Sequence, residues 1–284
     1  MLRGKGLTLE NILDELKIIC KENYGENNID LIKTAFNDVA ALFSGKRKGV
    51  QKCDTRYHDL MHTLQVIPPF IGIIDGWNKN KNTPYITREF FDIGIIAVLL
   101  HDTGYIKTED DVEGTGAKYT FTHIQRSADF AGLYLPQLGF DKYKISGVQN
   151  IIMCTGVKID YTKIPFNSDE ERTVGYALGT ADLLGQMSAN DYPEKLPVLY
   201  REFEEAYLYE GIEKLRKRKA IVYKSVDDLI SKTPYFYEVI VLGRLKNMGS
   251  MYKYLTHHFK DSRNHYIEAI EENIRKIKLA SSPQ

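Results

Sequence analysis

Closely spaced cysteines are missing from this sequence. Only three of the 284 residues are cysteines, Cys20, Cys53 and Cys154, and no two of them form a CxxC pair. Small secreted folds and zinc ribbons typically carry several cysteines at short, regular spacings. The sequence therefore predicts neither a disulfide framework nor a cysteine-ligated zinc site, and a reducing cytoplasm is the compartment that we expect.

The sequence also lacks an excess of charge of either sign. Lysine plus arginine number 38, as do aspartate plus glutamate, so the formal net charge is zero. Proteins that bind nucleic acids or anionic membranes usually carry a basic excess. The basic run "EKLRKRKA" at Glu213–Ala220 is offset by nearby glutamates and is typical of a solvated helix face. We expect no nucleic-acid partner, and local charges must attract any anionic ligand.

Apolar runs long enough to cross a membrane are absent. The longest, Val66–Ile74 and Ile93–Leu100, fall far short of the roughly 20 residues that a spanning helix needs. The N-terminal segment carries acidic residues throughout and has no continuous apolar stretch, unlike a signal or transit peptide. We therefore expect a cytoplasmic protein without a membrane segment.

Apolar residues at helical spacing, by contrast, recur along the whole chain. Residues suited to helix capping, such as Thr87, Asp141 and Ser168, stand just before several of these segments. The pattern predicts an all-α protein with little or no sheet, in which Pro68-Pro69 disturb the third helix. The expected helices cover residues 7–20, 29–44, 57–67, 88–102, 122–138, 141–154, 168–187, 194–222 and 263–279, with two more beginning at Ser225 and Thr233.

We divide the chain into three parts, without an internal repeat or a flexible linker to mark the boundaries. Residues 1–50 form N-terminal helices packed on the core, and residues 51–192 form the core that carries the chemistry. Residues 193–284 form a C-terminal helical extension of the same compact unit. The extension either covers the site or provides a contact for a homodimer, and the sequence leaves this open.

Four of the seven histidines are concentrated in one region. His58, His62, His101 and His123 all lie between positions 58 and 123. On one helix, His58 and His62 would project from the same face, because residues four apart are neighbours on a helix. Taken alone, such a pair is equally typical of solvated or internally bonded histidines, so the pair does not by itself indicate a site.

Three further polar residues stand in apolar surroundings. His101 and Asp102 follow the apolar run "IGIIAVLL", and Asp182 interrupts the apolar segment "GTADLLGQM". A buried aspartate is costly unless a metal or a partner compensates its charge, although each of these residues alone also fits a surface or ion-paired role. Together with His62 they form a mixed imidazole and carboxylate set, which suits Mn, Fe, Ni, Co or Zn better than Ca or Mg.

The order H…HD…D resembles the HD-domain superfamily of metal-dependent phosphohydrolases, over roughly Arg56 to Met187. The resemblance implies an HD-domain-like helical bundle with additional N- and C-terminal helices. The metal ligands that the resemblance implies are His62, His101, Asp102 and Asp182. "NIIMCTGV" lacks the further histidine of two-metal members, so we expect one divalent transition metal per chain.

The stretch "YHDLMH" is similar to the YHNxxH stretch of cyclic-nucleotide phosphodiesterases, in which the earlier histidine is the general acid. The likeness implies that His58 donates a proton and, with Asp102, is catalytic, while Asp59 replaces the asparagine of that stretch. The segment around His123 resembles the helix that follows the HD pair. His123 is then a substrate contact or a weak ligand of a second metal, or simply a residue near a helix start.

Three cations near the expected ligands are candidate phosphate contacts: Arg56, Lys107 and Arg126. A guanidinium can bind two phosphate oxygens at once, whereas Lys107 would act as a point charge, and each could equally be a surface residue. The acidic loop at residues 108–119 lies between two helices that carry site residues. It is either a lid over the site or a solvated loop.

The leading hypothesis is a metal-dependent phosphohydrolase that uses a metal-activated water. Its expected substrate is a small phosphate monoester or phosphodiester, most simply a nucleotide. Two alternatives remain: a non-catalytic module that binds a metal or a nucleotide, and a di-iron oxygenase on the same scaffold.

Overall fold

The computed structural model describes residues 7–281, and these residues are helical with no strand among them, which confirms the all-α prediction. The helices are α1 (Leu9–Tyr24), α2 (Asp30–Phe43), α3 (Leu60–Lys79), α4 (Arg88–Leu100), α5 (His123–Tyr134), α6 (Lys142–Met153), α7 (Asp169–Met187), α8 (Tyr192–Glu210), α9 (Ile212–Lys217), α10 (Val226–Tyr235), α11 (Leu242–Asn247), α12 (Leu255–Phe259) and α13 (His265–Ser281). Short 3₁₀ turns, such as η1 (Thr103–Tyr105), lie between some of them.

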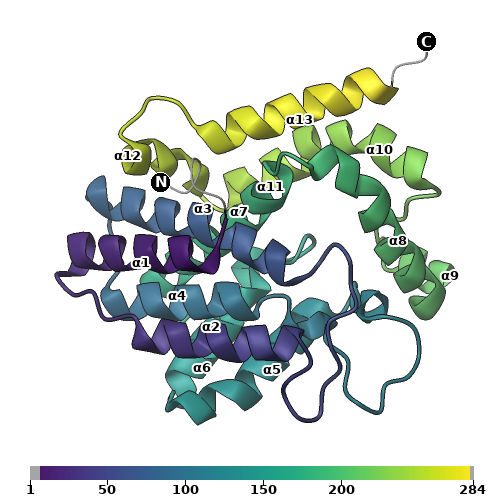
Figure 1. The fold of residues 1–284 in the computed structure, drawn as a ribbon. Coiled ribbons are helices and arrows are strands. Elements are labelled where there is room, and N and C mark those ends of the chain that lie inside the picture. The colour runs from purple at the N-terminus through teal and green to yellow at the C-terminus, as the bar shows by residue number, and fades with distance from the viewer. Residues whose placement is uncertain (1–6, 282–284) are drawn as a thin grey trace.

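Helices α3 and α7 pack against each other in the middle of the fold (Figure 1). Helices α4 and α6 pack on α7, and α12 and α13 pack on α3 and α7 respectively. Helices α8 and α9 extend along one side of the molecule (Figure 1). The two long connections before α3 and after α4 run side by side, joined by an isolated antiparallel bridge between Val50 and Thr108.

Side-chain caps form at most of the helix starts that the sequence predicts. The side chains of Thr87, Asp141, Ser168 and Ser225 each accept a hydrogen bond from the backbone N–H three residues later. Thr122 is at the N-cap position of α5, but its hydroxyl donates to the carbonyl of Tyr119, at 3.3 Å, instead of capping α5. The cap signals therefore located these helix starts to within a residue or two.

The expected disturbance of the third helix is wrong, because α3 continues through Pro68 and Pro69 to Lys79. Each proline removes one backbone hydrogen bond inside a helix. This part of α3 is almost wholly buried against α7, where a Cβ on Gly185 would lie only 2.7 Å from the carbonyl oxygen of Gln65. Close packing of two apolar helices thus outweighs the lost hydrogen bonds.

Two other helix predictions in the C-terminal part are also wrong. The expected helix at residues 194–222 is two helices, because Gly211 ends α8 with a φ of 85°. Pro234 begins no helix but lies inside α10, which continues directly into the π-helix η5 (Phe236–Val241) and α11. π-Helical turns are rare and often occur at functional sites.

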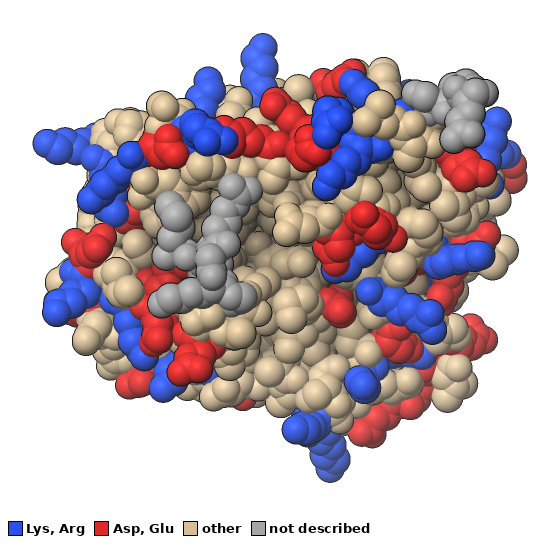
Figure 2. Space-filling model, turned by 45° about the horizontal axis from the view of Figure 1, so that its top comes forward, with Lys and Arg blue, Asp and Glu red and all other residues tan. Residues whose placement is uncertain are grey.

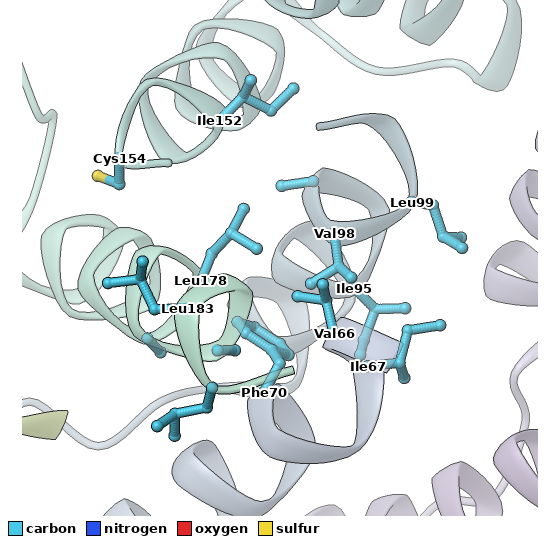
Figure 3. Close-up of a cluster of buried hydrophobic side chains, with 14 of the residues drawn as sticks. Val66, Ile67, Phe70, Ile95, Val98, Leu99, Ile152, Cys154, Leu178 and Leu183 are labelled. Atoms are coloured by element: carbon cyan, nitrogen blue, oxygen red, sulfur yellow. The ribbon is translucent and has the colours of Figure 1, made fainter. Parts of the chain in front are cut away.

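One hydrophobic cluster runs from Ile12 to Ile277 and includes side chains from all three expected parts of the chain. Its centre lies where α3, α4, α6 and α7 meet (Figure 3). There Phe70 of α3, Val98 of α4, Ile152 of α6 and Leu178 of α7 are fully buried. The packing holds these four helices in fixed positions, and three of them carry or directly precede the polar residues discussed below.

Charged side chains of both signs are interspersed over the face shown in Figure 2. This distribution agrees with the balanced composition of the chain. Among the described residues, no helix combines the length and the apolar composition that crossing a membrane requires.

A buried carboxylate, Asp75, joins α1, α3 and α12 at a distance from the histidine cluster. Asp75 is fully buried and accepts hydrogen bonds from Asn23 at 2.7 Å, from Lys79 at 2.8 Å and from His258 at 2.6 Å. Burial alone would raise the pKa of Asp75, but these three donors outweigh it and hold the pKa below its ordinary value.

We expect Asp75→Asn to lower the free energy of unfolding by about 2–3 kcal/mol near pH 6, because hydrogen bonds to a charged acceptor are lost. A carboxyl whose pKa is lowered by folding stabilises the protein above its unfolded pKa and loses this contribution as the pH falls through the folded value. The difference between wild type and Asp75→Asn should therefore shrink between about pH 5 and pH 3. Urea unfolding of both proteins at these pH values measures this difference in the free energy of unfolding. The exposed Asp14→Asn is the control, with a change below about 0.5 kcal/mol; a pH-independent difference would contradict the assignment.

Candidate metal centre

His62 lies in the first turn of α3, where the side chain of Asp59 caps the helix by accepting from the backbone N–H of His62 at 2.9 Å. His58 precedes this cap and is therefore not on the helix, so the expectation of two histidines on one helical face is wrong. The rings still meet edge to face, with centroids 5.4 Å apart. A different contact, described below, places His58.

His101 and Asp102 directly follow α4, whose last residues are completely buried. The Nδ1 of His101 lies 2.7 Å from the carbonyl oxygen of Val98. Because a carbonyl can only accept, Nδ1 carries a hydrogen, and Nε2 is the nitrogen that lies beside Asp102. The helix thus delivers a buried imidazole nitrogen and a buried carboxylate side by side.

The side chains of His62, His101 and Asp102 converge on one point. Oδ2 of Asp102 lies 3.3 Å from Nε2 of His62 and 3.4 Å from Nε2 of His101. Both Nε2 of His101 and Oδ2 of Asp102 are buried without a hydrogen-bond partner in the described structure. Unpartnered buried polar atoms are costly, and a metal ion would satisfy both of them. These three residues could therefore hold a metal ion.

Asp182 reaches the same cluster from the middle of α7. Its Oδ1 lies 3.4 Å from Nε2 of His62 and 3.8 Å from Nε2 of His101. Burial would raise the pKa values of Asp182 and Asp102, but the surrounding histidines lower both below their ordinary values. The sequence-predicted ligands from three helical segments are thus brought together, with both carboxylates ionised.

His123 begins α5 at the edge of the cluster. Its Nε2 lies 3.7 Å from Oδ1 of Asp102, and its Nδ1 lies 2.7 Å from the carbonyl oxygen of Thr120. Gly104 permits this approach, because a Cβ there would overlap the backbone of His123. Burial lowers the pKa of His123 to about 4. A neutral imidazole with a free Nε2 next to Asp102 suits either a substrate contact or a further metal ligand.

Glu202 of α8 determines the position of His58. One carboxylate oxygen of Glu202 lies 2.6 Å from Nδ1 of His58, and the other accepts from the backbone N–H groups of Arg56 and Tyr57. Burial alone would lower the pKa of His58, but Glu202 outweighs this effect and raises it to about 9. The ring of His58 also stacks on Tyr105, with centroids 4.6 Å apart. His58 is therefore a fixed imidazolium near neutral pH.

A cavity of about 410 Å³ opens onto this cluster. His58, His62, His123, Asp102 and Asp182 contribute to its lining. The other walls are mainly apolar and aromatic and come from α7, α8, α10 and the connections that precede α5 and follow α6. A small molecule in this cavity can thus contact the candidate metal ligands and His58 at once.

The structure does not bring Arg56, Lys107 or Arg126 to this cavity. Arg56 is exposed, and Lys107 is buried in an ion pair with Asp54, 3.2 Å apart. Arg126 donates to the carbonyls of Gly104 and Ile106. These cations are close to the ligands in the sequence but do not line the cavity. Lys107 and Arg126 instead stabilise the connection after α4.

The loop at residues 108–119, considered as a lid, is firmly anchored. Thr115 donates to Glu205 through both its N–H and its hydroxyl, and the N–H of Gly116 donates to Asp54 at 2.7 Å. Asp111 accepts from Lys118 and Tyr119 within the loop. The loop is thus held by hydrogen bonds to other parts of the protein and within itself. Its residues are not among those that line the cavity.

Two residues of the site were missed by the sequence analysis. Glu202 is one of the glutamates that offset the basic run, and it lies 144 positions from His58, whose ring it holds in place. Its place on the buried face of α8, between Leu199 and Ala206, is the signal that could have indicated it. Lys158, on the connection after α6, lines the cavity and is exposed, and no local pattern distinguishes it from other surface lysines.

The fold and the cluster together define an all-α protein with a buried histidine and aspartate group that could hold a metal ion. The chain belongs to the Npun_R2479-like family, whose model matches residues 3–277. No curated protein matches the sequence significantly.

Proposed function

We propose that the protein is a metal-dependent phosphohydrolase of small phosphate esters. The observation that carries the proposal is the pair of unpartnered buried atoms, Nε2 of His101 and Oδ2 of Asp102, beside a cavity that also contains a fixed His58. The resemblance of the H…HD…D order to HD-domain phosphohydrolases supports the same reaction class.

His62, His101, Asp102 and Asp182 are the residues that would hold the ion, one per chain. Two imidazole nitrogens and two carboxylates suit Mn, Fe, Ni, Co or Zn. Such an ion, when bound, lowers the pKa of a water molecule and polarises a phosphoryl oxygen. Both carboxylates are buried and ionised, so the chain itself supplies two negative charges to attract a divalent cation.

In this proposal His58 protonates the oxygen of the leaving group. Its Nδ1 is occupied by Glu202, so Nε2 is the nitrogen that remains for a ligand in the cavity. A proton donor held in place contributes typically 10²–10⁴-fold to such a reaction. Among the lining residues that the structure describes, Lys158 is the only lysine or arginine, and it replaces the three cations first considered as the phosphate contact.

The direct test is hydrolysis of phenyl phosphate and bis(4-nitrophenyl) phosphate by metal-stripped protein, with each of the five metals added singly. We expect release of phenol or nitrophenol with at least one metal, and loss of that activity on chelation. Metal analysis of anaerobically purified protein should give one ion per chain. Tight metal binding without turnover of either ester would favour the non-catalytic binding module, and two irons per chain would favour the oxygenase.

A further inference from the structure

The part of the cavity beyond the candidate ligands has a markedly apolar wall. Its most apolar contributors come from α8, the connection before α10, α10 itself and η5: Leu196, Leu199, Phe203, Ile221, Leu229 and Phe236. Surface of this kind favours a ligand whose own surface is apolar, because contact removes both from water.

Several polar groups of the cavity lining are already hydrogen-bonded within the protein. The hydroxyls of Thr120, Thr155 and Thr233 donate to the carbonyls of Ala117, Ile152 and Leu229 respectively. The amide oxygen of Gln186 accepts from the hydroxyl of Tyr57 at 3.1 Å. The free donors that remain in the described lining include the phenol hydroxyls of Tyr105, Tyr192 and Tyr223 and the NH₂ group of Gln186. A nucleotide has more polar groups than these donors can pair, and each buried polar group left unpaired is costly.

Positive charge in the cavity is also limited. Lys158 is the single lysine or arginine in the described lining, and His58 already pairs with Glu202. One phosphate beside a metal and Lys158 would be neutralised, whereas a di- or triphosphate would bring further charges without partners. The volume of about 410 Å³ is near the lower end of the usual range for small-molecule sites, about 300–1,000 Å³.

We infer that the substrate is a monophosphate ester whose other part is an uncharged apolar group, aromatic or branched-alkyl, rather than a nucleotide. The phosphate lies at the histidine and aspartate cluster, and the apolar group lies against α8, α10 and η5. That the ester is hydrolysed rests on the proposed function, whereas the preference of the cavity for an apolar ligand does not.

The test uses phenyl phosphates with a methyl, ethyl, propyl or butyl group in the para position, because these phenols are nearly equal as leaving groups. With the metal-loaded protein, kcat/KM should rise by about fourfold for each added methylene that enters the cavity. Thymidine monophosphate and ATP should be poorer substrates than the butyl compound. The inference would be overturned if kcat/KM did not change with alkyl length, or if a nucleotide were the best substrate.

Ala220→Trp provides a matched test of where the alkyl group binds. Ala220 lines the cavity and is only partly buried, so the indole should fill the apolar part with little effect on folding. We expect it to remove the preference for butyl over methyl, so that kcat/KM for the two compounds becomes equal within about threefold. Lys217→Trp, at an exposed position of α9 outside the lining, is the control and should keep the preference. An unchanged preference in Ala220→Trp would contradict the assigned wall.

Binding separates this inference from the proposed function. Para-alkylphenyl phosphonates cannot be hydrolysed, so their dissociation constants for the manganese-loaded protein report the cavity alone. A tightening of about fourfold per methylene supports the apolar-ester assignment even if every ester proves inert, in which case only the hydrolase proposal fails. Phosphonates that bind equally whatever their alkyl length would overturn the inference even if hydrolysis is observed.

Discussion

Asp102→Asn is expected to weaken manganese binding by more than about 100-fold and to abolish ester hydrolysis. Loss of a residue that only supports a metal ligand typically costs 10–100-fold in affinity, so loss of a ligand itself should cost more. Asp102 is also the residue on which the site converges, because His62, His101 and His123 all lie within 3.7 Å of its carboxylate. Isothermal titration with manganese measures the first effect, and release of phenol from phenyl phosphate measures the second.

The asparagine keeps the size of the side chain, so the variant should fold. Circular dichroism should show an unchanged helical content. Asp92→Asn, on the preceding helix α4 and in an ion pair with Arg88, is the matched control and should retain metal binding and activity. Undiminished manganese affinity in Asp102→Asn would show that His62, His101 and Asp102 do not form the metal centre. The proposed chemistry would then also be wrong.

His101, Asp102 and Asp182 could be singled out from the sequence because each lies in a local pattern that the fold preserves, whereas only the family resemblance distinguishes His62 from His58. His101 and Asp102 end an apolar run, and Asp182 interrupts another, so burial of both helices forced these polar side chains toward a shared interior site. The helix caps were equally local, since Thr87 or Ser168 depends on residues at most a turn away. Local signals of this kind are readable without coordinates.

The parts that could not be predicted depend on contacts between distant segments. Glu202 contacts His58 although the two residues are 144 positions apart, and the sequence around His58 does not indicate this partner. The opposite error occurred with Arg126, which lies close to His123 in sequence but donates to the carbonyls of Gly104 and Ile106. Pro68-Pro69 predict a disturbed helix because the proline penalty is local, whereas the packing that overcomes this penalty comes from α7. The apolar cavity wall comes from the C-terminal extension, for which the sequence alone leaves open whether it covers the site or provides a dimer contact.

His58→Asn should reduce kcat for para-methylphenyl phosphate by roughly 10²–10⁴-fold, the usual contribution of a general acid. The same variant should lose less than about tenfold with 4-nitrophenyl phosphate, because nitrophenolate is a weak base and leaves without a proton. The comparison of the two esters separates proton donation from a general disturbance of the site. Equal losses with both esters would show that His58 binds or positions the substrate instead.

Glu202→Gln extends the same argument to the residue that positions His58. The amide oxygen of glutamine can still accept from the backbone N–H groups of Arg56 and Tyr57, whereas its NH₂ group cannot accept from an imidazolium. We therefore expect a smaller loss than in His58→Asn, again greater for the methylphenyl ester than for the nitrophenyl ester. Glu204→Gln, on the same helix but partly exposed in its pair with Arg201, is the control. If Glu202→Gln affected both esters equally, Glu202 would act on the fold of this segment rather than on the proton that His58 holds.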